Sequence, residues 1–503
     1  MRNVLFLFVL LSLSISANAA EYIIKQKDMS LKSSFQMQGV RIMQTHAKGN
    51  LTLIDINENN KAAILAEIMQ DPNVEYVVDN FKIEKPKIPF NKAMLKNLKE
   101  QWANAKANLD KAWQIGGKGS KDVKIAVIDT GVDYNHESLN TNMVAGYDFR
   151  DNDADPMDET SARNPGHGTH CTGSIAGNGL IDGGIVGAIP NVSIIPIRFL
   201  GADGSGDLMG GIKSIDFAIE KGAHVISASW GATIDRGRAK ALVEAVERAD
   251  KAGVIFVAAA ANDGKNNDKT EVYPANAGFP NTISVAASDV NDAKPSWSNF
   301  GQRTVHIASP GHNIMSTLPI NKYGNLSGTS MATPLVAGIV GLLKSKDISL
   351  TGAQIRALLQ STGDKVSIET ACNCRVDAGA AMQALVNKDM LLVPMAAAMS
   401  VNDIVQMSVM NAKGTISYAS SDENIVSVDT NGLVTAKKEG TAKISAKTAD
   451  QTLESLEFVV GNASSGGGDK PNPPGGGDGE CPLGDPQLCE IMCGIQPDLP
   501  WCQ

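Results

Sequence analysis

The sequence predicts an α/β protein built around a three-layer domain with a mostly parallel sheet, preceded by a small α+β unit and followed by a small β-sandwich. Apolar strand-like runs alternate with helical patterns from about residue 123 to about residue 386, which is typical of a parallel sheet covered on both faces. After about residue 390, short alternating strands with turn signals follow. At 503 residues, the chain is also too long for one core, since single cores stop growing near roughly 250–300 residues.

Residues 1–19 have the pattern of a signal peptide. Arg2 supplies a positive charge, residues 4–15 form an apolar run, and residues 17–19 are a small-x-small cleavage signal. The apolar run is shorter than the roughly 20 residues that a membrane-spanning helix needs. We therefore expect cleavage after Ala19, no membrane span, and export to the extracellular space, the periplasm or the cell surface.

Residues 20–100 are expected to form a small α+β unit and a connection. The connection, residues 84–99, holds two prolines and five lysines, and exposed polar segments of this kind are where proteolytic nicking concentrates. An ordinary linker between two domains would have the same composition. The expected elements are strands at 21–27 and 50–56, a helix at 60–70 and a closing strand at 74–83.

Residues 101–388 are expected to form the domain with the parallel sheet. Four apolar runs predict strands, and two amphipathic patterns between them predict helices that cover the sheet. Functional side chains of such sheets gather at the carboxyl ends of the strands. The expected strands are at 124–130, 193–200, 224–230 and 254–262, and the helices at 208–222 and 236–253.

The last part of the chain predicts three segments. Residues 390–462 alternate as in a β-sandwich, with a hairpin turn at residues 430–432, and residues 463–480 form a Gly/Pro-rich flexible linker. Residues 481–503 hold four of the seven cysteines and predict a disulfide-stapled module. Zinc is the alternative, but the paired CxxC units of zinc sites are missing. Cys372 and Cys374 form a separate close pair.

Three residues carry a possible chemistry. Peptide cleavage through a serine needs a hydroxyl beside a base, a third group that holds the base, and donors for the oxyanion. Ser330 lies in GTSMATP before an apolar helix, where unpaired amides and a positive partial charge would suit an oxyanion. Pro334 is tolerated there if it falls in or near the first turn. His167 lies where the glycine-rich GHGTHC meets a helix, and Asp129 ends the strand KIAVIDT.

Each of these residues alone has a simpler explanation. A serine that opens a helix is more often a cap. His167 and His170 could bind a metal or fill the core, and Asp129 could start the turn TGVD. Together, however, they follow the chain order Asp, His, Ser, which is that of the subtilisin triad.

The motifs DTGVD, GHGTHCTG and GTSMATP resemble the signatures of the subtilisin-like serine proteases (subtilases) over about residues 103–386. The spacing is similar too, with 38 residues from Asp129 to His167 and 163 from there to Ser330. The resemblance implies a secreted serine endopeptidase in which Ser330 is the nucleophile, His167 the general base and Asp129 the residue that orients it, without a catalytic cofactor. It also implies that Asn262 donates to the oxyanion. Ala261 stands where glycine is usual, and its methyl group would narrow the adjoining specificity pocket.

Two further segments resemble the edges between which the family's substrates lie as an added β-strand. One is GADGSG at residues 201–206, which could otherwise be an ordinary loop, and the other is residues 229–231. Glycines allow close backbone approach, and main-chain hydrogen bonds give affinity with little dependence on sequence. Extended polypeptides are therefore the expected substrates. The residues expected to bind them are Gly204, Ser205, Gly206, Ser229, Trp230 and Gly231.

Cys171 and an acidic loop resemble features of the thermitase and proteinase K branch. Cys171, four residues after His167, would be a buried structural thiol rather than a nucleophile. The stretch DFRDNDADPMDE resembles a calcium loop, although a solvated acidic loop is the alternative. Another calcium site of the family is doubtful, because Ser138 stands where aspartate is usual. The candidate ligands for structural calcium are Asp151, Asp153, Asp155 and Asp158.

The flanking segments also resemble known modules. Residues 20–100 resemble the family's propeptide, a chaperone and inhibitor that the enzyme itself removes, and residues 390–462 resemble a bacterial Ig-like domain (group 2). We therefore expect a monomeric, self-processing zymogen whose partners are its own propeptide and polypeptide substrates. The net charge of −9 gives no reason to expect a nucleic-acid partner. The alternatives are a catalytically silent adhesion protein that acts through the Ig-like domain and a narrowly specific processing protease.

Overall fold

A computed structural model of the chain describes residues 19–30, 39–57, 61–85, 101–181, 184–449 and 451–461. Most of the predicted signal peptide, the predicted linker at 463–480 and the cysteine-rich module at 481–503 lie outside the described residues. The chain divides into two compact units, Met1–Asn80 with Gly477–Gln503 and Phe81–Gly476. Within the described ranges, every helix is too short or too polar to span a bilayer.

The smaller unit is an antiparallel sheet with one helix, as the sequence predicts. Its strand order is β2-β3-β1-β4, and Ile24, Ile54 and Leu65 belong to one buried apolar cluster. This core follows from alternating strands that place one apolar face toward an amphipathic helix. The strands are β1 (Ala19–Gln26), β2 (Val40–His46), β3 (Leu51–Asn57) and β4 (Val74–Asp79), with a 3-10 turn at Ala47–Gly49, and the helix is α1 (Lys61–Met69).

The predicted closing strand at 74–83 is two strands rather than one. β4 ends at Asp79 and pairs with β1, whereas β5 (Lys82–Glu84) pairs antiparallel with β9 (Ser205–Asp207) of the larger unit. Asn80 donates from its backbone amide to the carbonyl of Glu21, so the chain leaves the first sheet at this polar interruption. The single-strand prediction was therefore wrong at its end.

The larger unit contains a nine-stranded sheet with the order β18-β19-β15-β14-β12-β10-β6-β8-β7. Neighbouring strands are parallel except β18 and β19. All four predicted strands lie in it, as β6, β8, β10 and β12. The bounds are β6 (Gly119–Asp129), β7 (Tyr147–Asp148), β8 (Asn191–Arg198), β10 (Val225–Ala228), β12 (Ile255–Ala259), β14 (Thr282–Ser288), β15 (Ile307–Pro310), β18 (Asp364–Lys365) and β19 (Cys374–Arg375).

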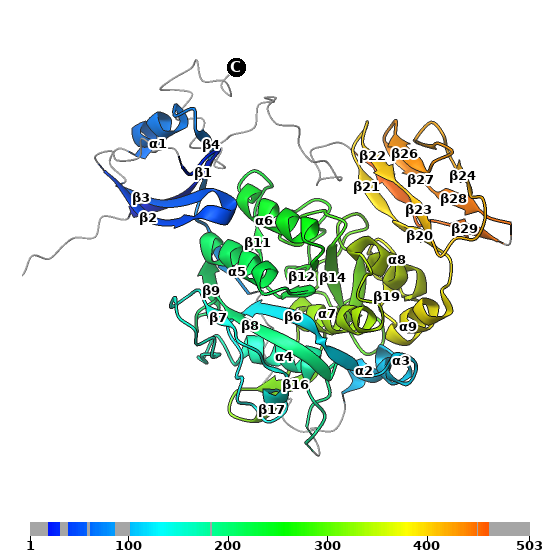
Figure 1. Cartoon of the computed structure of the whole chain (residues 1–503), viewed down its shortest axis with the longest axis horizontal. Helices are drawn as coiled ribbons and strands as arrows, with labels where there is room; N and C mark the ends of the chain where they lie inside the picture. Colours follow the sequence, from blue (N-terminus) through cyan, green and yellow to red (C-terminus); the bar gives the residue numbers. More distant parts are fainter. Residues whose placement is uncertain are drawn as a thin grey trace, which may run out of the picture. The chain divides into compact units, whose positions relative to one another are not determined.

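Helices cover both faces of this sheet and complete three layers (Figure 1). The two predicted helices, α5 and α6, lie on one face, and α4 and α7 pack on the other. Nearly all of α7 is buried, which agrees with its apolar character all round. The helices are α2 (Trp102–Lys106), α3 (Leu109–Gly116), α4 (His167–Ala176), α5 (Leu208–Glu220), α6 (Lys240–Lys251), α7 (Thr329–Lys346), α8 (Gly352–Thr362) and α9 (Ala378–Asn387), with a 3-10 turn at Asn140–Asn142.

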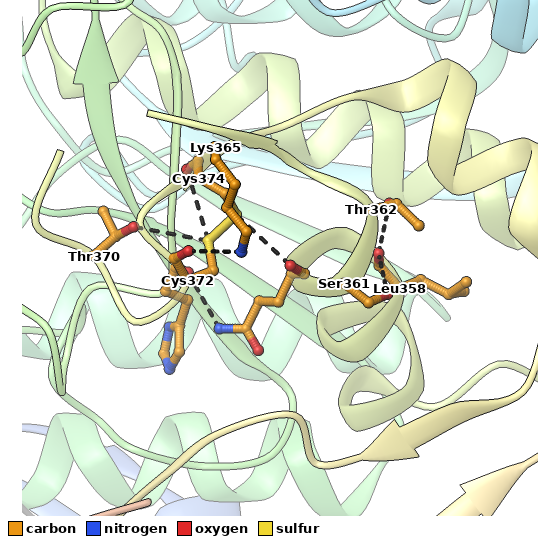
Figure 2. The surroundings of a disulfide bond; sticks show 9 residues. Leu358, Ser361, Thr362, Lys365, Thr370, Cys372 and Cys374 are labelled. Atoms are coloured by element: carbon orange, nitrogen blue, oxygen red, sulfur yellow. Dashed lines mark hydrogen bonds between the residues drawn. A yellow bond between two sulfur atoms is a disulfide. The ribbon is translucent and has the colours of Figure 1, made fainter. Parts of the chain in front are cut away.

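Two short antiparallel pairs and a disulfide stand beside the main sheet. β11 (Ala232–Thr233) pairs with β13 (Val272–Tyr273), and β16 (Ile314–Leu318) with β17 (Lys322–Leu326). The close cysteine pair is a disulfide between Cys372 and Cys374 (Figure 2). Lys365 donates from Nζ to the carbonyl of Cys372 at 3.1 Å. The disulfide joins the connection between β18 and β19 to the first residue of β19.

The segment after α9 consists of short strands around one apolar core, as predicted. The hairpin turn is present: Gly432 has a φ of 81° and donates to the carbonyl of Asp429 at 3.0 Å. The strands are β20 (Leu391–Val393), β21 (Ala397–Met399), β22 (Ile404–Gln406), β23 (Ser408–Met410), β24 (Ser417–Ser420), β25 (Val426–Val428), β26 (Leu433–Ala436), β27 (Gly440–Ala442), β28 (Ile444–Lys447), β29 (Thr452–Glu454) and β30 (Phe458–Val460).

Candidate active site

The three residues expected to carry chemistry stand at the ends of three elements. β6 ends at Asp129, α4 begins at His167, and α7 begins one residue before Ser330. All three placements were predicted from the motifs. In a parallel sheet the carboxyl ends of the strands face one edge, and the first turns of α4 and α7 meet the end of β6 there.

Asp129 and His167 form a buried pair. Asp129 Oδ1 lies 2.6 Å from His167 Nδ1, and the two side chains are 1% and 0% exposed. The Thr130 amide donates to the same oxygen at 2.7 Å. An ionised carboxylate only accepts hydrogen bonds, so Nδ1 carries the proton and Nε2 is left as the acceptor of the neutral ring. Among the described residues, Nε2 has no hydrogen-bond partner.

Ser330 is buried beside this pair, but its hydroxyl points elsewhere. Its Oγ donates to the carbonyl of Ser229 at 3.3 Å rather than to His167 Nε2. A change of its χ1 rotamer would redirect the hydroxyl. Such bonds are often long or absent in ligand-free sites and form only with substrate, so this geometry is compatible with a nucleophile and its base.

Pro334 leaves the carbonyl of Ser330 without its helical hydrogen-bond donor. It is the sixth residue of α7 rather than part of the first turn, and because proline lacks an amide hydrogen, the carbonyl of Ser330 has no donor four residues later. That carbonyl instead accepts from Ser229 Oγ at 3.0 Å and from Cys171 Sγ at 3.3 Å. The proline is tolerated because side chains replace the missing donor.

Cys171 is a free, buried cysteine, as expected. Its Sγ lies 4.0 Å from His167 Nδ1. Burial raises the pKa of this thiol well above its usual value, and the nearby carboxylate of Asp129 raises it further. The side chain therefore stays a neutral thiol and is unsuited to act as a nucleophile.

Asn262 is oriented toward the first turn of α7. Its Oδ1 accepts from the backbone amide and from Oγ1 of Thr329, each at 2.9 Å. An amide hydrogen can only be donated, so this contact fixes which end of the side chain is oxygen. The Nδ2 group then lies against Gly328, 3.1 Å from the position that a β-carbon would take there. This is a suitable place for an oxyanion donor next to Ser330.

The two predicted substrate edges lie one strand apart, and residues of this chain stand between them. Ile83 and Glu84 pair with Gly206 and Ser205 of β9, and Glu84 also forms an antiparallel bridge with Gly231. On the other edge, the Gly231 amide donates to the carbonyl of Glu84 at 3.1 Å. The chain thus forms the kind of added strand expected of a substrate.

The remaining edge residues have different parts. The carbonyl of Gly204 accepts from the Lys85 amide at 3.1 Å. Ser229 holds Ser330, as described above, and Trp230 is fully buried and donates from Nε1 to the carbonyl of Ile128 at 2.7 Å. Of the predicted segment 229–231, only Gly231 presents backbone to the added strand.

Ile83 occupies an apolar pocket that the sequence analysis did not predict. It is fully buried, and a β-carbon on Gly211 would lie 3.2 Å from its Cδ1, close to the rings of Phe199 and Trp230. Those two rings pack edge to face, 4.9 Å apart. The alternating pattern of residues 74–83 was the available signal, but it does not identify the partner of a strand.

A cavity of about 410 Å³ continues this cleft beside Asn262. Gly231, Ala259, Ala261 and Val272 contribute to its wall. Ala261, noted as a departure from glycine, has a φ of 86°, in the region that favours residues without a β-carbon. The backbone at this position therefore keeps a conformation suited to glycine although it carries a methyl group.

The four aspartates of the predicted calcium loop do not converge. Asp151 pairs with Arg198 at 2.9 Å, Asp153 accepts from the Asp155 amide at 2.8 Å, and both carboxylate oxygens of Asp158 accept hydrogen bonds from the interior. Among the described residues, the only His, Cys, Asp or Glu side chains whose ligand atoms cluster in threes are Asp129, His167 and Cys171. Asp158 lies apart from the exposed carboxylates because its partners hold it inside.

Two other expectations have definite outcomes. His170 does not join His167 at a metal site; its Nε2 contacts the carbonyls of Ile314 and Gly324 at 2.9 and 3.1 Å, so it fills the core. Ser138, at the position where aspartate is usual, shares a hydrogen bond with Tyr323 Oη at 2.8 Å.

Comparison with known proteins finds two family models that match parts of the larger unit. Residues 120–381 match the model of the subtilase family, and residues 385–458 match the bacterial Ig-like domain (group 2). Thermitase of Thermoactinomyces vulgaris is 42% identical over 268 residues, which are 53% of this chain and 89% of thermitase. The thermophilic serine proteinase of Bacillus sp. (strain AK1) is 38% identical over 312 residues, 61% of this chain and 72% of that protein. The major intracellular serine protease of Bacillus subtilis (strain 168) is 40% identical over 234 residues, 46% of this chain and 71% of that protein.

Proposed function

Because this chain belongs to the subtilase family and is a serine-type endopeptidase, we propose that it is a secreted, monomeric, self-processing zymogen with Asp129, His167 and Ser330 as its catalytic triad. The observation that carries the triad is the buried 2.6 Å contact between Asp129 and His167 at the carboxyl edge of the sheet, where the first turn of α7 brings Ser330. Export follows from the signal-peptide pattern of residues 1–19.

In the acylation step, Ser330 Oγ attacks the peptide carbonyl while His167 Nε2 takes its proton. Asp129 holds Nδ1–H and stabilises the imidazolium that forms. The oxyanion lies between Asn262 Nδ2 and the backbone amide of Ser330, in the first turn of α7, where helical amides lack intrahelical acceptors.

Acylation ends when His167 gives this proton to the leaving amine and the peptide C–N bond breaks. Water then enters, gives a proton to His167 Nε2 and attacks the acyl carbon. His167 returns that proton to Ser330 Oγ as the acyl–oxygen bond breaks, which releases the carboxylate product and restores Ser330. No step needs a cofactor, because the base, the nucleophile and the oxyanion donors all come from the chain.

Substrates are extended polypeptides that bind as a strand between β9 and Gly231. The antiparallel pairing of residues 82–85 with both edges supports this proposal, since its hydrogen bonds are made by main-chain groups. The same pairing supports an inhibitory role for the segment that precedes the peptidase domain, because a tail held there excludes a substrate strand. Broad rather than narrow cleavage follows from this backbone recognition.

Structural calcium remains a proposal for Asp151, Asp153 and Asp155, whose carboxylates are the oxygen ligands that calcium prefers but would have to move together to bind it, because they do not converge in this structure. Asp158 is not part of it. If calcium binds, millimolar calcium should raise the Tm of the Ser330→Ala protein relative to the same protein in a chelator. Asp153→Asn should abolish that difference, and an unchanged difference would contradict the site.

The triad is tested with Ser330→Ala and the matched control Ser309→Ala, a buried serine of β15. N-terminal sequencing should find that the control has lost its N-terminal segment, whereas Ser330→Ala still begins directly after the signal peptide. Only the control should react with a fluorophosphonate probe. If Ser330→Ala is processed and labelled like the control, the proposed nucleophile is wrong.

A catalytically silent adhesion protein, the alternative from sequence, is not supported, because two of the matched relatives are named as serine proteases and the subtilase model covers residues 120–381, which include Asp129, His167 and Ser330. The Ig-like domain would then be an accessory module of a secreted enzyme.

A further inference from the structure

The first turn of α4, which carries His167, is capped entirely from outside the helix. Its N-cap residue is Gly166, which has no side chain to accept a hydrogen bond. The amides of His167 and Gly168 donate to Asn164 Oδ1 at 2.9 Å and to Thr130 Oγ1 at 3.0 Å. A helix terminus leaves these amides without intrahelical partners, so their position depends on the external side chains.

The third amide of this turn, that of Thr169, leads to Asp158. It donates to Asp158 Oδ2 at 2.9 Å, and the Thr169 hydroxyl donates to the same oxygen at 2.7 Å. The other oxygen, Oδ1, accepts from Thr130 Oγ1 and from Asn164 Nδ2, each at 2.9 Å. The two other capping groups, Asn164 and Thr130, are thus bonded to the carboxylate that caps the third amide.

This carboxylate also reaches the other half of the catalytic pair. Thr130 follows Asp129 directly, and its amide donates to Asp129 Oδ1, the oxygen that contacts His167. Through Thr130, Asp158 therefore holds the end of β6, and through Asn164 and Thr169 it holds the start of α4. Along the chain, the 36 residues between Thr130 and His167 separate these two segments.

Burial shapes the charge at this position. Asp158 is 4% exposed, and desolvation raises its pKa to about 6, while the hydrogen bonds from Thr169, Asn164 and Thr130 lower it. Its contact with a helix N-terminus favours the ionised form as well. Burial of a carboxylate costs free energy, and the four donors offset this cost only while they keep their positions around it.

We propose that Asp158 is a positioning residue for the catalytic pair, holding Asp129 and His167 in register through Thr130, Asn164 and Thr169. This inference rests on the proposed triad. Misplacement of reacting groups by about 1 Å can lower a rate roughly 100-fold, so loss of the carboxylate should act on the rate of the chemical step while substrate still binds the cleft edges.

The test compares Asp158→Asn with Asp216→Asn in the active, processed enzyme. The asparagine keeps the shape but turns an NH2 group toward donors, whereas Asp216 is a buried aspartate of α5 that accepts two hydrogen bonds from Arg248. After active-site titration, we expect Asp158→Asn to lower kcat by about 10- to 100-fold with KM within twofold. Asp216→Asn should lower Tm but keep the parental kcat.

A spectroscopic measurement covers the case in which Asp158→Asn folds poorly. In the Ser330→Ala protein, the low-field proton resonance of His167 Nδ1–H reports its contact with Asp129. The milder Thr169→Val, which removes one donor to Asp158, should shift or broaden this resonance, and Asp216→Asn should leave it unchanged.

Two results would overturn the inference: a parental kcat for Asp158→Asn, or an equal loss of kcat in Asp216→Asn, which would show a general effect of lost stability. An unaltered resonance in Thr169→Val would contradict it as well. Failure of the triad itself is separate, because it would appear as activity in Ser330→Ala.

Discussion

Ala261 shows how a single residue can conflict with the backbone that carries it. Its φ of 86° places it in the left-handed region, where a β-carbon costs roughly 1–2 kcal/mol. Family resemblance identified this position as one where glycine is usual, and the structure supplies the physical reason. The neighbouring Ala260 is buried but is not among the residues with positive φ.

We predict that Ala261→Gly leaves the free energy of unfolding unchanged or raises it by up to about 1 kcal/mol, because relief of strain offsets the greater freedom of glycine in the unfolded chain. The control Ala260→Gly should lower it by roughly 0.5–1 kcal/mol. Urea unfolding of both variants in the Ser330→Ala background measures the difference. Equal losses in the two variants would contradict the strain.

His170 gives the protein a predictable weakness toward acid. It is fully buried, and desolvation together with the nearby His167 lowers its pKa to about 3, against the opposing effect of its hydrogen bonds with Ile314 and Gly324. Between pH 6.5 and about 3, His170 binds a proton in the unfolded chain but not in the folded protein. Each pH unit in this range should therefore lower the free energy of unfolding by up to about 1.4 kcal/mol.

We predict that His170→Gln flattens this decline, since glutamine can donate to the same carbonyl groups without titrating. Urea unfolding of the Ser330→Ala protein, with and without the substitution, should show converging stabilities as the pH falls from 6.5 to 4. Parallel curves would mean that His170 is not the responsible group.

Residue-scale prediction from the sequence succeeded where a residue type and its neighbours carry the signal. Asp129, His167 and Ser330 stand at element ends because glycine-rich turns and apolar runs flank them. Asp158 was assigned to the acidic loop because its neighbours are acidic. Its four donor groups belong to Thr130, Asn164 and Thr169, and only folding brings them together.

At the scale of elements, periodicity predicted four strands of the parallel sheet and two helices that cover it, whereas the strands β7, β14, β15, β18 and β19 and the partner of each strand were not predicted. Residues 74–83 read as one alternating strand, but β5 leaves the first sheet for β9. Period-2 alternation shows which side chains share a face, and it carries no information about which edge accepts the backbone. Pro334 lies just after the first turn of α7, and its tolerance depends on Ser229 and Cys171, which its position in the sequence does not show.

We predict that Ile83→Asp shortens the lag before activity appears after the zymogen is produced. A carboxylate cannot occupy the apolar pocket formed by Phe199 and Trp230 without a large desolvation cost. The control Glu84→Gln changes a side chain that is exposed and should keep the parental lag. Progress curves with a chromogenic peptide measure it, and identical lags in all three proteins would argue against β5 as the inhibitory contact.

On the scale of the whole molecule, the groups proposed for catalysis come from a limited stretch of the chain. Asp129, His167, Asn262 and Ser330 all lie within residues 119–346, from the start of β6 to the end of α7. The strands from β20 to β30 contribute none of them. The change in composition after about residue 390 predicts this division, although contacts join residues 81–476 in one compact unit.

We predict that a chain ending at residue 389 keeps its kcat/KM for short peptides within about twofold. Its Tm should fall, because Ala357 of α8 belongs to the same buried cluster as Leu392 and Val393 and loses apolar cover. Active-site-titrated kinetics and thermal unfolding measure the two effects. A large loss of kcat/KM at unchanged Tm would assign the C-terminal strands a part in catalysis.

If β5 is the inhibitory contact that we propose, dilution decides whether the processed enzyme becomes active. While the chain is continuous, its tail meets the cleft at an effective concentration in the millimolar range, typical of short tethers. Once the connection is cut, the same segment must find the cleft at its bulk concentration. A concentrated preparation would therefore stay inhibited after cleavage. The same enzyme released into a large volume would become active without any further chemical event.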